Sequence, residues 1–215
     1  MAAVVFDLDG TLVDSLGDIA ASTNVCLAAA GLPTHTQDAI RGFVGYGMGM
    51  LVERALGPHA TPTRVESLLA AVRSHYQQHA TDRTLPFPGI AELLETLVER
   101  GVSLAIVSNK PHELTTNIVR VLFPDVPFGF VTGESPAIPR KPDPTGLLTA
   151  CATLGVSPST TMYIGDTPVD MEAARAANMR SVAVTWGFRD RAALESARPD
   201  HWATQPEDIL AALEG

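Results

Sequence analysis

Short apolar runs rich in β-branched residues alternate with segments of helical periodicity along most of the chain, and this alternation limits the folds open to it. Such runs are typical of strands buried on both faces, as in parallel sheets. The clearest helix lies within residues 88–100, where apolar residues recur at helical spacing before Gly101. The alternation predicts an α/β fold built on a doubly wound parallel sheet. The predicted strands cover residues 3–6, 102–107, 128–131, 161–164 and 181–184.

Residues 14–82 interrupt this alternation, because they show helical periods and no convincing strand. Between residues 65 and 76, for example, the apolar residues fall on one face of a helix. Asp14-Ser15 suits the start of a helix, and the proline-rich residues 86–88 suit a linker. We therefore expect an inserted all-helical domain. The expected domains are an α/β core of residues 1–13 and 83–215 and the helical insertion of residues 14–82.

Two carboxylates stand at the end of the first predicted strand. Asp7 and Asp9 are two residues apart, so in an extended chain their side chains project to one side, about 7 Å from each other. Like charges this close raise each other's pKa unless a cation lies between them, and a divalent metal ion would serve. The dipeptide Asp9-Gly10 is also typical of a hairpin turn, so this pair by itself leaves both interpretations open.

Polar residues follow the other predicted strands as well. Ser108 and Asn109 come where the strand 102–107 ends, although an ordinary strand-to-helix loop would look similar. Lys141 stands between prolines that stiffen its backbone, although a solvated lysine in a turn has the same sequence. Asp166 follows a strand, and Asp170 lies where it could cap the start of the next helix.

The joint placement of these groups favours a functional site. In an open parallel sheet, ligands bind outside the carboxyl ends of the strands, and three predicted strands end on such polar groups. Lys110 and Lys141 are the only lysines among fifteen basic residues, which marks both positions for inspection. Oxygen ligands without sulfur or imidazole partners suit magnesium rather than zinc. The residues concerned are Asp7, Asp9, Asp166 and Asp170, with Ser108, Asn109 and Lys141.

Charge and composition exclude several classes of partner. The net charge of −9, from 15 basic and 24 acidic residues, is the reverse of what a nucleic-acid backbone or an anionic membrane surface attracts. No apolar run approaches the roughly 18 residues of a membrane span, and no basic leader precedes Asp7. Cys26 and Cys151 lack metal-ligand spacing and suit a reducing compartment. We expect a cytoplasmic protein without nucleic-acid or membrane partners. The sequence leaves the oligomeric state open and is compatible with a monomer.

Four segments resemble, in order and context, the motifs of the haloacid dehalogenase superfamily. They are Asp7-Leu8-Asp9-Gly10-Thr11, Ser108, Lys141, and Gly165-Asp166 followed by Asp170. The resemblance covers the whole chain, since the helical insertion lies where that superfamily places its cap. Within the superfamily, the chain looks like a phosphoglycolate phosphatase. The segments similar to that subgroup are residues 13–15, 45–47, 108–111 and 141–144.

The resemblance implies a magnesium-dependent phosphatase that works through an aspartyl-phosphate. Asp7 would attack phosphorus as the nucleophile. Asp9 would act first as general acid and then as general base. Asp7, Asp166 and the main-chain carbonyl of Asp9 would hold the metal ion, with Asp170 behind them.

The resemblance also implies how the phosphoryl group is held. Ser108 and Lys141 would bind the phosphoryl oxygens, which is the electrostatic positioning that phosphoryl transfer requires. Further substrate contacts would come from Gly10, Thr11 and Asn109. The expected partner is a small phosphorylated metabolite.

The cap is expected to select the substrate, because the core motifs hold only the phosphoryl group. The segment Gly45-Tyr46-Gly47 suits a cap loop that faces the site and binds substrate. Arg41 is the cap arginine nearest this loop and the candidate for binding a substrate carboxylate, although an exposed arginine at a helix end would look similar. We expect 2-phosphoglycolate as the first substrate, with pyrophosphate and sugar phosphates as alternatives.

Rival functions differ from this interpretation in testable ways. A non-enzymatic phospho-receiver module also combines a phosphorylated aspartate, a hydroxyl, a lysine and magnesium, but it needs only about 120 residues and no helical insertion. A dehalogenase would use Asp7 as its nucleophile but would have no acidic residue at the position of Asp9. A phosphomutase would return the phosphoryl group to a sugar instead of water, and kinetics would separate it from a phosphatase.

Overall fold

The computed structural model describes residues 3–214, and it confirms the predicted fold class. Within these residues one six-stranded sheet has the order β5-β4-β1-β6-β7-β8, and all its neighbouring strands are parallel. The strands are β1 (Ala3–Phe6), β4 (Ser103–Pro111), β5 (Phe128–Glu134), β6 (Thr161–Gly165), β7 (Arg180–Val184) and β8 (His201–Ala203).

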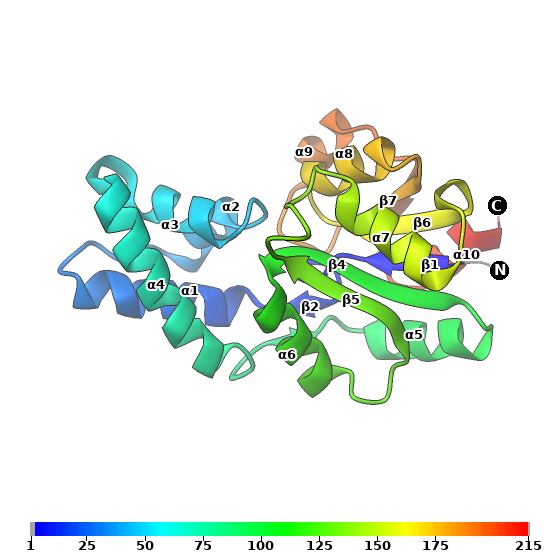
Figure 1. The fold of residues 1–215 in the computed structure, drawn as a ribbon, viewed down its shortest axis with the longest axis horizontal. Coiled ribbons are helices and arrows are strands. Elements are labelled where there is room, and N and C mark those ends of the chain that lie inside the picture. The colour runs from blue at the N-terminus through cyan, green and yellow to red at the C-terminus, as the bar shows by residue number, and fades with distance from the viewer. Residues whose placement is uncertain (1–2, 215) are drawn as a thin grey trace.

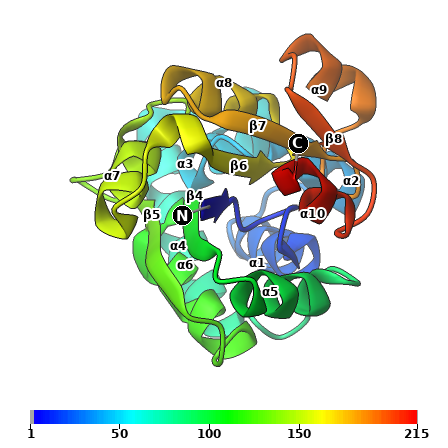
Figure 2. The same cartoon turned by 90° about the vertical axis from the view of Figure 1, so that its right-hand side faces the viewer.

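Helices cover both faces of the sheet, so the strands are apolar on both sides. Val4 and Phe6 of β1 belong to the core cluster that includes residues of α5, α6 and α10. Val5, between them, points to the opposite face and packs in a cluster with residues of α7 and α8. Figure 2 shows α8 above the sheet and α5 below it. These helices are α5 (Ile90–Glu99), α6 (His112–Leu122), α7 (Thr145–Leu154), α8 (Pro168–Ala176), α9 (Arg191–Ser196) and α10 (Asp208–Glu214).

The chain order of the strands reverses at β1. Strands β4 and β5 extend the sheet on one side of β1, and β6, β7 and β8 extend it on the other. Connections that leave in opposite directions from neighbouring strands open a crevice at the carboxyl ends of those strands. The sheet topology therefore places a ligand site where β1 ends.

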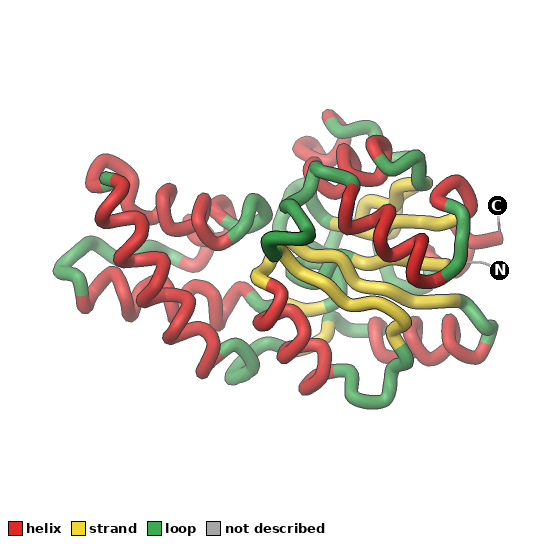
Figure 3. The backbone as a smooth tube through the Cα atoms, in the orientation of Figure 1, coloured by secondary structure: helices red, strands yellow, loops and turns green. Residues whose placement is uncertain are grey.

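The remaining helices form a separate cluster beside the carboxyl ends of the strands, as Figures 1 and 3 show. Helix α1 packs against α4 and α2, and α3 packs against α2 and α4. Buried Leu68, Val72 and Tyr76 lie on one face of α4, as their spacing predicts. The elements are α1 (Leu16–Ala29), α2 (Gln37–Phe43), α3 (Met48–Leu56), the 3-10 turn η1 (Gly57–His59) and α4 (Pro62–His79).

Two short strands join this cluster to the sheet-bearing part. Strand β2 (Val13–Asp14) pairs antiparallel with β3 (Leu85–Pro86), so the outgoing and returning segments are hydrogen-bonded to each other. Of the expected linker residues 86–88, only Pro86 lies in β3. A two-residue strand has no measurable period, which is why the sequence does not predict it.

The structure shows three other features that the sequence pattern does not predict. Strand β8 lies at the sheet edge, and its three residues include polar His201. Strand β4 continues through residues 108–111 with a shift in its register to β5, instead of ending at Val107. The 3-10 turn η2 (Pro158–Thr160) precedes β6. Within residues 3–214, no helix combines the length and apolar character that crossing a membrane requires.

Candidate active site

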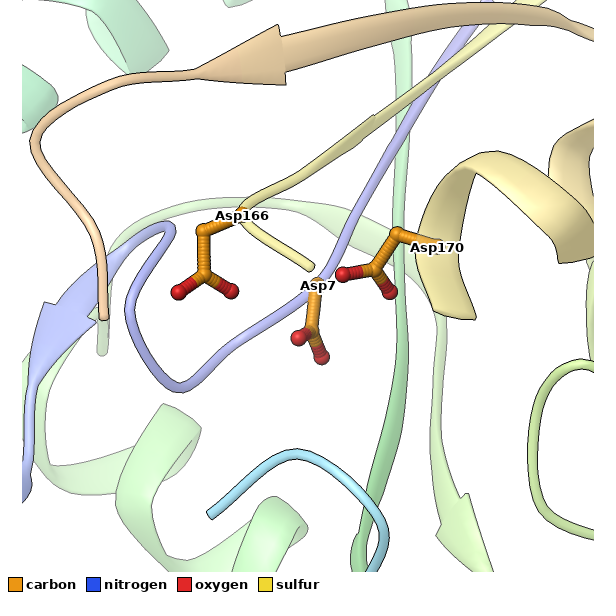
Figure 4. Close-up of side chains that lie close together, drawn as sticks. All are labelled: Asp7, Asp166 and Asp170. Carbon is orange, nitrogen blue, oxygen red and sulfur yellow. The ribbon is translucent and has the colours of Figure 1, made fainter. Parts of the chain in front are cut away.

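Three carboxylates meet at the carboxyl end of β1. Asp7 follows β1, Asp166 follows β6, and Asp170 lies in the first turn of α8. Each offers an oxygen that lies within 4.8 Å of the oxygens from the other two. Figure 4 shows the three side chains converging from these elements. All three are buried, so elements far apart in the sequence have built one acidic centre.

The electrostatics of this centre fit a bound cation. Burial, together with the charges of Asp170 and Asp9, raises the pKa of Asp7 to about 6 despite the opposing effect of Lys141. Burial, together with the charges of Asp170 and Asp7, raises the pKa of Asp166 well above its usual range. Asp166 Oδ1 is buried and has no hydrogen-bond partner among the described residues. A hard divalent cation would relieve this repulsion and complete the bonding of that oxygen.

Asp170 also performs the structural role that the sequence left open. Its Oδ2 accepts hydrogen bonds from the main-chain nitrogen of Thr167 at 3.0 Å and from the Thr167 hydroxyl at 2.7 Å, which caps α8. Its Oδ1 accepts a hydrogen bond from Lys141 Nζ at 2.7 Å. The cap and the charged centre therefore share one carboxylate, and neither interpretation displaces the other.

Lys141 is buried rather than solvated. Its ammonium lies 3.0 Å from Asp7 Oδ1 and donates to Asp170 and, at 2.6 Å, to the hydroxyl of Tyr163. Although burial alone would lower the pKa of Lys141, the two carboxylates raise it above its usual value. The ammonium is thus a fixed positive charge between Asp7 and Asp170.

Ser108 and Asn109 lie in the shifted part of β4. Ser108 is buried, lines the pocket described below, and accepts a hydrogen bond from the main chain of Lys110 at 3.3 Å. The side chain of Asn109 accepts from the main-chain nitrogen of Lys141 at 2.7 Å and donates to the carbonyl of Gly45 at 3.0 Å. Asn109 therefore ties the Lys141 segment and the cap loop to the end of β4.

Asp9 is bonded to residues outside the acidic centre. Its Oδ1 accepts a hydrogen bond from the Ser15 hydroxyl and lies 3.0 Å from Lys110 Nζ. The side chain of Asp9 is thus not among the three that converge, while its main-chain carbonyl belongs to the backbone that follows Asp7. Ser15 precedes α1, as expected, but its hydroxyl binds Asp9 instead of capping that helix.

Lys110 lies in the site, although it was not among the expected site residues. Its side chain is 3% exposed, and its ammonium donates to the hydroxyl of Tyr76 on α4 at 2.7 Å. Burial would lower the pKa of Lys110, but the charges of Asp9 and Tyr76 raise it to about 12. Two sequence signals marked this position, namely the scarcity of lysine in the chain and the subgroup-like segment 108–111.

Gly10 and Thr11 form the turn after Asp9. Gly10 has a φ of +81°, and a Cβ built there would lie 2.2 Å from an Asp166 oxygen, so only glycine fits. The Thr11 hydroxyl is buried without a hydrogen-bond partner among residues 3–214, and its carbonyl accepts from the Trp186 indole at 3.1 Å. Gly10 therefore adjoins Asp166, but neither Gly10 nor Thr11 lines the pocket beside this centre.

A pocket connects this centre to the helical cluster. Asp7, Asp9 and Ser108 lie on its core side, and residues of α1, α3 and α4 form its opposite wall. Gly45 and Gly47 of the predicted cap loop line it as well. The cap-side lining residues are Ile19, Thr23, Val44, Met48, Leu51, Val72 and Tyr76.

Arg41 and Tyr46 are placed differently from the sequence-based expectation. The Arg41 guanidinium pairs with exposed Asp38 at 3.6 Å and does not line the pocket. The Tyr46 side chain is exposed and lies against Arg54, and its carbonyl accepts a hydrogen bond from Arg140. Proximity in sequence to the glycine-rich loop does not bring either side chain to the pocket, because α2 directs Arg41 outward.

The core also holds the cap loop through Arg189, which sequence reasoning missed. Its guanidinium donates to the carbonyls of Arg41 and Val44, at and just beyond the end of α2. A cation near the last carbonyls of a helix is favourable. Arg189 lies outside the matched motifs, so only the three-dimensional structure relates it to this loop.

We expect Gly165→Ala to disable the acidic centre. A Cβ at Gly165 would lie 2.3 Å from the Cβ of Asp170, so β6 or α8 must shift. A displacement near 1 Å costs about 100-fold in catalysis, and the overpacking costs about 1–3 kcal/mol of stability. Kinetics and thermal unfolding would measure both. Gly49→Ala is the matched control, because apart from its own helix and chain neighbours no atom lies within 4 Å of the added Cβ. Unchanged kinetics in Gly165→Ala would contradict the described packing.

Comparisons with known proteins agree with this geometry. The family model for haloacid dehalogenase-like hydrolases matches residues 4–184. The phosphoglycolate phosphatase of Aquifex aeolicus is 33% identical over 214 residues, covering 100% of this chain and 97% of its own length. The N-acetylmuramic acid 6-phosphate phosphatase of Pseudomonas aeruginosa is 32% identical over 219 residues, covering 100% and 95%.

A solved structure from Lactobacillus delbrueckii subsp. bulgaricus, provisionally described as a phosphoglycolate phosphatase, has a TM-score of 0.93 at 33% identity. The superposition covers 98% of this chain and 97% of that one. The sequence-based prediction of a phosphatase similar to the phosphoglycolate phosphatases is confirmed by these matches. The chain belongs to the family of haloacid dehalogenase-like hydrolases.

Proposed function

We propose that this phosphatase hydrolyses small phosphomonoesters with Mg²⁺ and an aspartyl-phosphate formed on Asp7, and that 2-phosphoglycolate is its first substrate. The observation that carries the proposal is the buried centre of Asp7, Asp166 and Asp170 beside the Lys141 ammonium, open to a pocket through Asp7. Phosphoryl transfer needs such positioning and charge compensation more than covalent chemistry.

In the first half-reaction, a carboxylate oxygen of Asp7 attacks phosphorus in line, and the bond to the leaving oxygen breaks. Asp9 gives a proton to that oxygen as general acid. Ser108 and the nearby main-chain nitrogens hold the phosphoryl oxygens, and Lys141 offsets negative charge beside Asp7. In the second half-reaction, Asp9 takes a proton from the water that attacks phosphorus, which releases phosphate and restores Asp7.

Asp7, Asp166 and the main-chain carbonyl of Asp9 would hold the Mg²⁺, with Asp170 oriented behind them by Thr167 and Lys141. When bound, the ion would supply positive charge to the phosphoryl oxygens and reduce repulsion between the carboxylates. The raised pKa values of Asp7 and Asp166 and the unpaired Asp166 Oδ1 support this assignment.

Residues 14–82 act in this proposal as a cap over the leaving group. The pocket wall on that side is mostly apolar, with Thr23 and Tyr76 as its hydroxyl-bearing residues. Burying several sugar hydroxyls against such a wall would leave them without partners, at about 1–3 kcal/mol each. The wall therefore supports a short leaving group over a free sugar phosphate.

A sugar-phosphate phosphatase is the second candidate, supported by the similarity to the N-acetylmuramic acid 6-phosphate phosphatase. The test is a phosphate-release screen with 2-phosphoglycolate, pyrophosphate and hexose phosphates at equal concentration. A hundredfold preference for hexose phosphates would overturn the proposed substrate and leave the phosphatase chemistry intact. Transfer of phosphate to a sugar, without release, would identify a mutase instead.

Removal of divalent metal should abolish activity. Without a cation, the buried carboxylates near the phosphoryl site repel a phosphate dianion, and we expect phosphate release to fall at least a hundredfold in excess EDTA. Titration with Mg²⁺ should restore it, and the midpoint of thermal unfolding should rise on Mg²⁺ addition. Full activity in EDTA would exclude the metal-dependent mechanism.

A further inference from the structure

Lys110 is the cation of the pocket between the acidic centre and the cap. Among the described residues that line this pocket, no arginine and no other lysine occurs. Lys110 lies next to Asp9, which would protonate the leaving oxygen, with Nζ 3.0 Å from the Asp9 carboxylate. The positive charge is therefore on the leaving-group side of the pocket, whereas Lys141 serves the phosphoryl side.

The ammonium of Lys110 has bonding capacity left for a ligand. An ammonium carries three hydrogen-bond donors. One is directed to the Tyr76 hydroxyl at 2.7 Å and another to Asp9 at 3.0 Å. Within residues 3–214 the structure gives the third donor no partner, and the hydroxyl proton of Tyr76 has none either. Both residues line the pocket, so these donors can serve a ligand there.

The surroundings of Lys110 strengthen the attraction between its ammonium and an anion. The Tyr76 ring centroid lies 4.5 Å from Nζ, and α1, α3 and α4 place Ile19, Leu51 and Val72 along the wall. A charge held in such an apolar, water-poor pocket interacts with an anion more strongly than a surface charge does. The pocket thus favours one anionic group beside Lys110 and apolar atoms elsewhere.

We propose that Lys110 is a specificity-determining residue that binds a carboxylate on the leaving group of the substrate. This inference rests on the proposed function and narrows its substrate class to short phosphomonoesters with a carboxylate close to the ester oxygen. In 2-phosphoglycolate a single methylene separates the two groups. Asp9 would protonate the ester oxygen, and the Lys110 ammonium lies next to Asp9. A single methylene therefore suits the separation between the ester oxygen at Asp9 and a carboxylate at Lys110.

Lys110, and not Arg41, is therefore the candidate for binding the substrate carboxylate. The guanidinium of Arg41 is about half exposed, pairs with Asp38, and lies outside the pocket lining. A substrate carboxylate in the pocket can approach Lys110 but not Arg41 without a change in α2.

The test compares two esters that differ in charge at one position, 2-phosphoglycolate and 2-hydroxyethyl phosphate, with the Mg²⁺-loaded full chain. We expect wild type to prefer 2-phosphoglycolate. Lys110→Met should reduce the ratio of the two kcat/KM values about 10–100-fold, chiefly through KM for 2-phosphoglycolate, because a hydrogen bond to a charged group is lost. Tyr76→Phe should reduce the ratio about 3–10-fold, since the ring stays and one donor is lost.

Arg73→Met is the matched control, because it removes one positive charge from an exposed position of the same helix, α4. Equal losses for both esters in Lys110→Met would show that Lys110 acts only through Asp9 and would overturn the proposal. Absence of a preference in wild type, or loss of the preference in Arg41→Met, would overturn it too. If Lys110→Met fails to fold, an unchanged ratio of the two kcat/KM values in Tyr76→Phe would overturn the proposal.

The outcome also separates this inference from the proposed function. Wild type that hydrolyses both esters with Mg²⁺ but ignores the carboxylate would refute the role of Lys110 and retain the phosphatase. Wild type that hydrolyses neither ester would refute both.

Discussion

Asp7→Asn should lower kcat at least about 10⁴-fold while the protein stays folded. The amide cannot form the aspartyl-phosphate, and the loss of a covalent nucleophile commonly costs this much. Phosphate release under single-turnover and steady-state conditions would measure it. Asp125→Asn is the control, because it removes a carboxylate from an exposed loop between α6 and β5. Near wild-type turnover in Asp7→Asn would exclude Asp7 as the nucleophile.

The same variant should be at least as stable as wild type without metal. Burial raises the folded-state pKa of Asp7 to about 6 from 3.8, so the stability gained from its proton is present at low pH and lost as pH rises through 6. At neutral pH the ionised carboxylate therefore costs folding free energy, on the order of 2–3 kcal/mol. Asparagine removes that cost. Thermal unfolding at pH 5 and pH 7.5 would show the difference growing with pH.

Lys141→Ala should damage both turnover and folding. The ammonium lies 3.0 Å from Asp7 and 2.7 Å from Asp170, so its removal leaves two buried carboxylates without their cation. Breaking a buried ion pair costs about 3–5 kcal/mol, which in a chain of this size lowers Tm by roughly 10 °C. We expect kcat/KM to fall about 100–1,000-fold, because a fixed charge near the transferring group is lost. Calorimetry and phosphate release would measure the two effects, and Mg²⁺ should restore part of the stability.

Lys110→Ala should cost less activity than Lys141→Ala toward esters without a carboxylate. Lys110 adjoins one carboxylate, Asp9, whereas Lys141 adjoins two. Both ammonium groups are buried, so the expected difference comes from the groups they contact and not from exposure. Equal losses from the two substitutions on 2-hydroxyethyl phosphate would show that the assigned roles are wrong.

The sequence predicted the sheet and the placement of polar residues at its strand ends, because both depend on local patterns. Runs such as residues 3–6 and 161–164 are apolar throughout, which requires burial on both faces and hence a parallel sheet between helices. The carboxyl ends of parallel strands lie at one edge, so Asp7 and Asp166 could be expected at the same edge of the sheet. That β1 and β6 are neighbours, which brings the two carboxylates together, is seen only in the structure. The two-residue strands β2 and β3 are too short to show an apolar pattern, so their pairing could not be predicted.

What the sequence determined by itself is the α/β core, the helical insertion and the group of aspartates with Lys141, because apolar periodicity and strand-end placement are encoded locally. Only the tertiary structure decided that Lys110, and not Arg41, faces the pocket, and that Arg189 holds the cap loop. Those relations depend on contacts between the helical cluster and the sheet-bearing part, such as those of Tyr76 with Lys110 and of Arg189 with Val44. Packing between distant segments sets the direction of each side chain, and no local pattern in residues 41 or 110 contains that information.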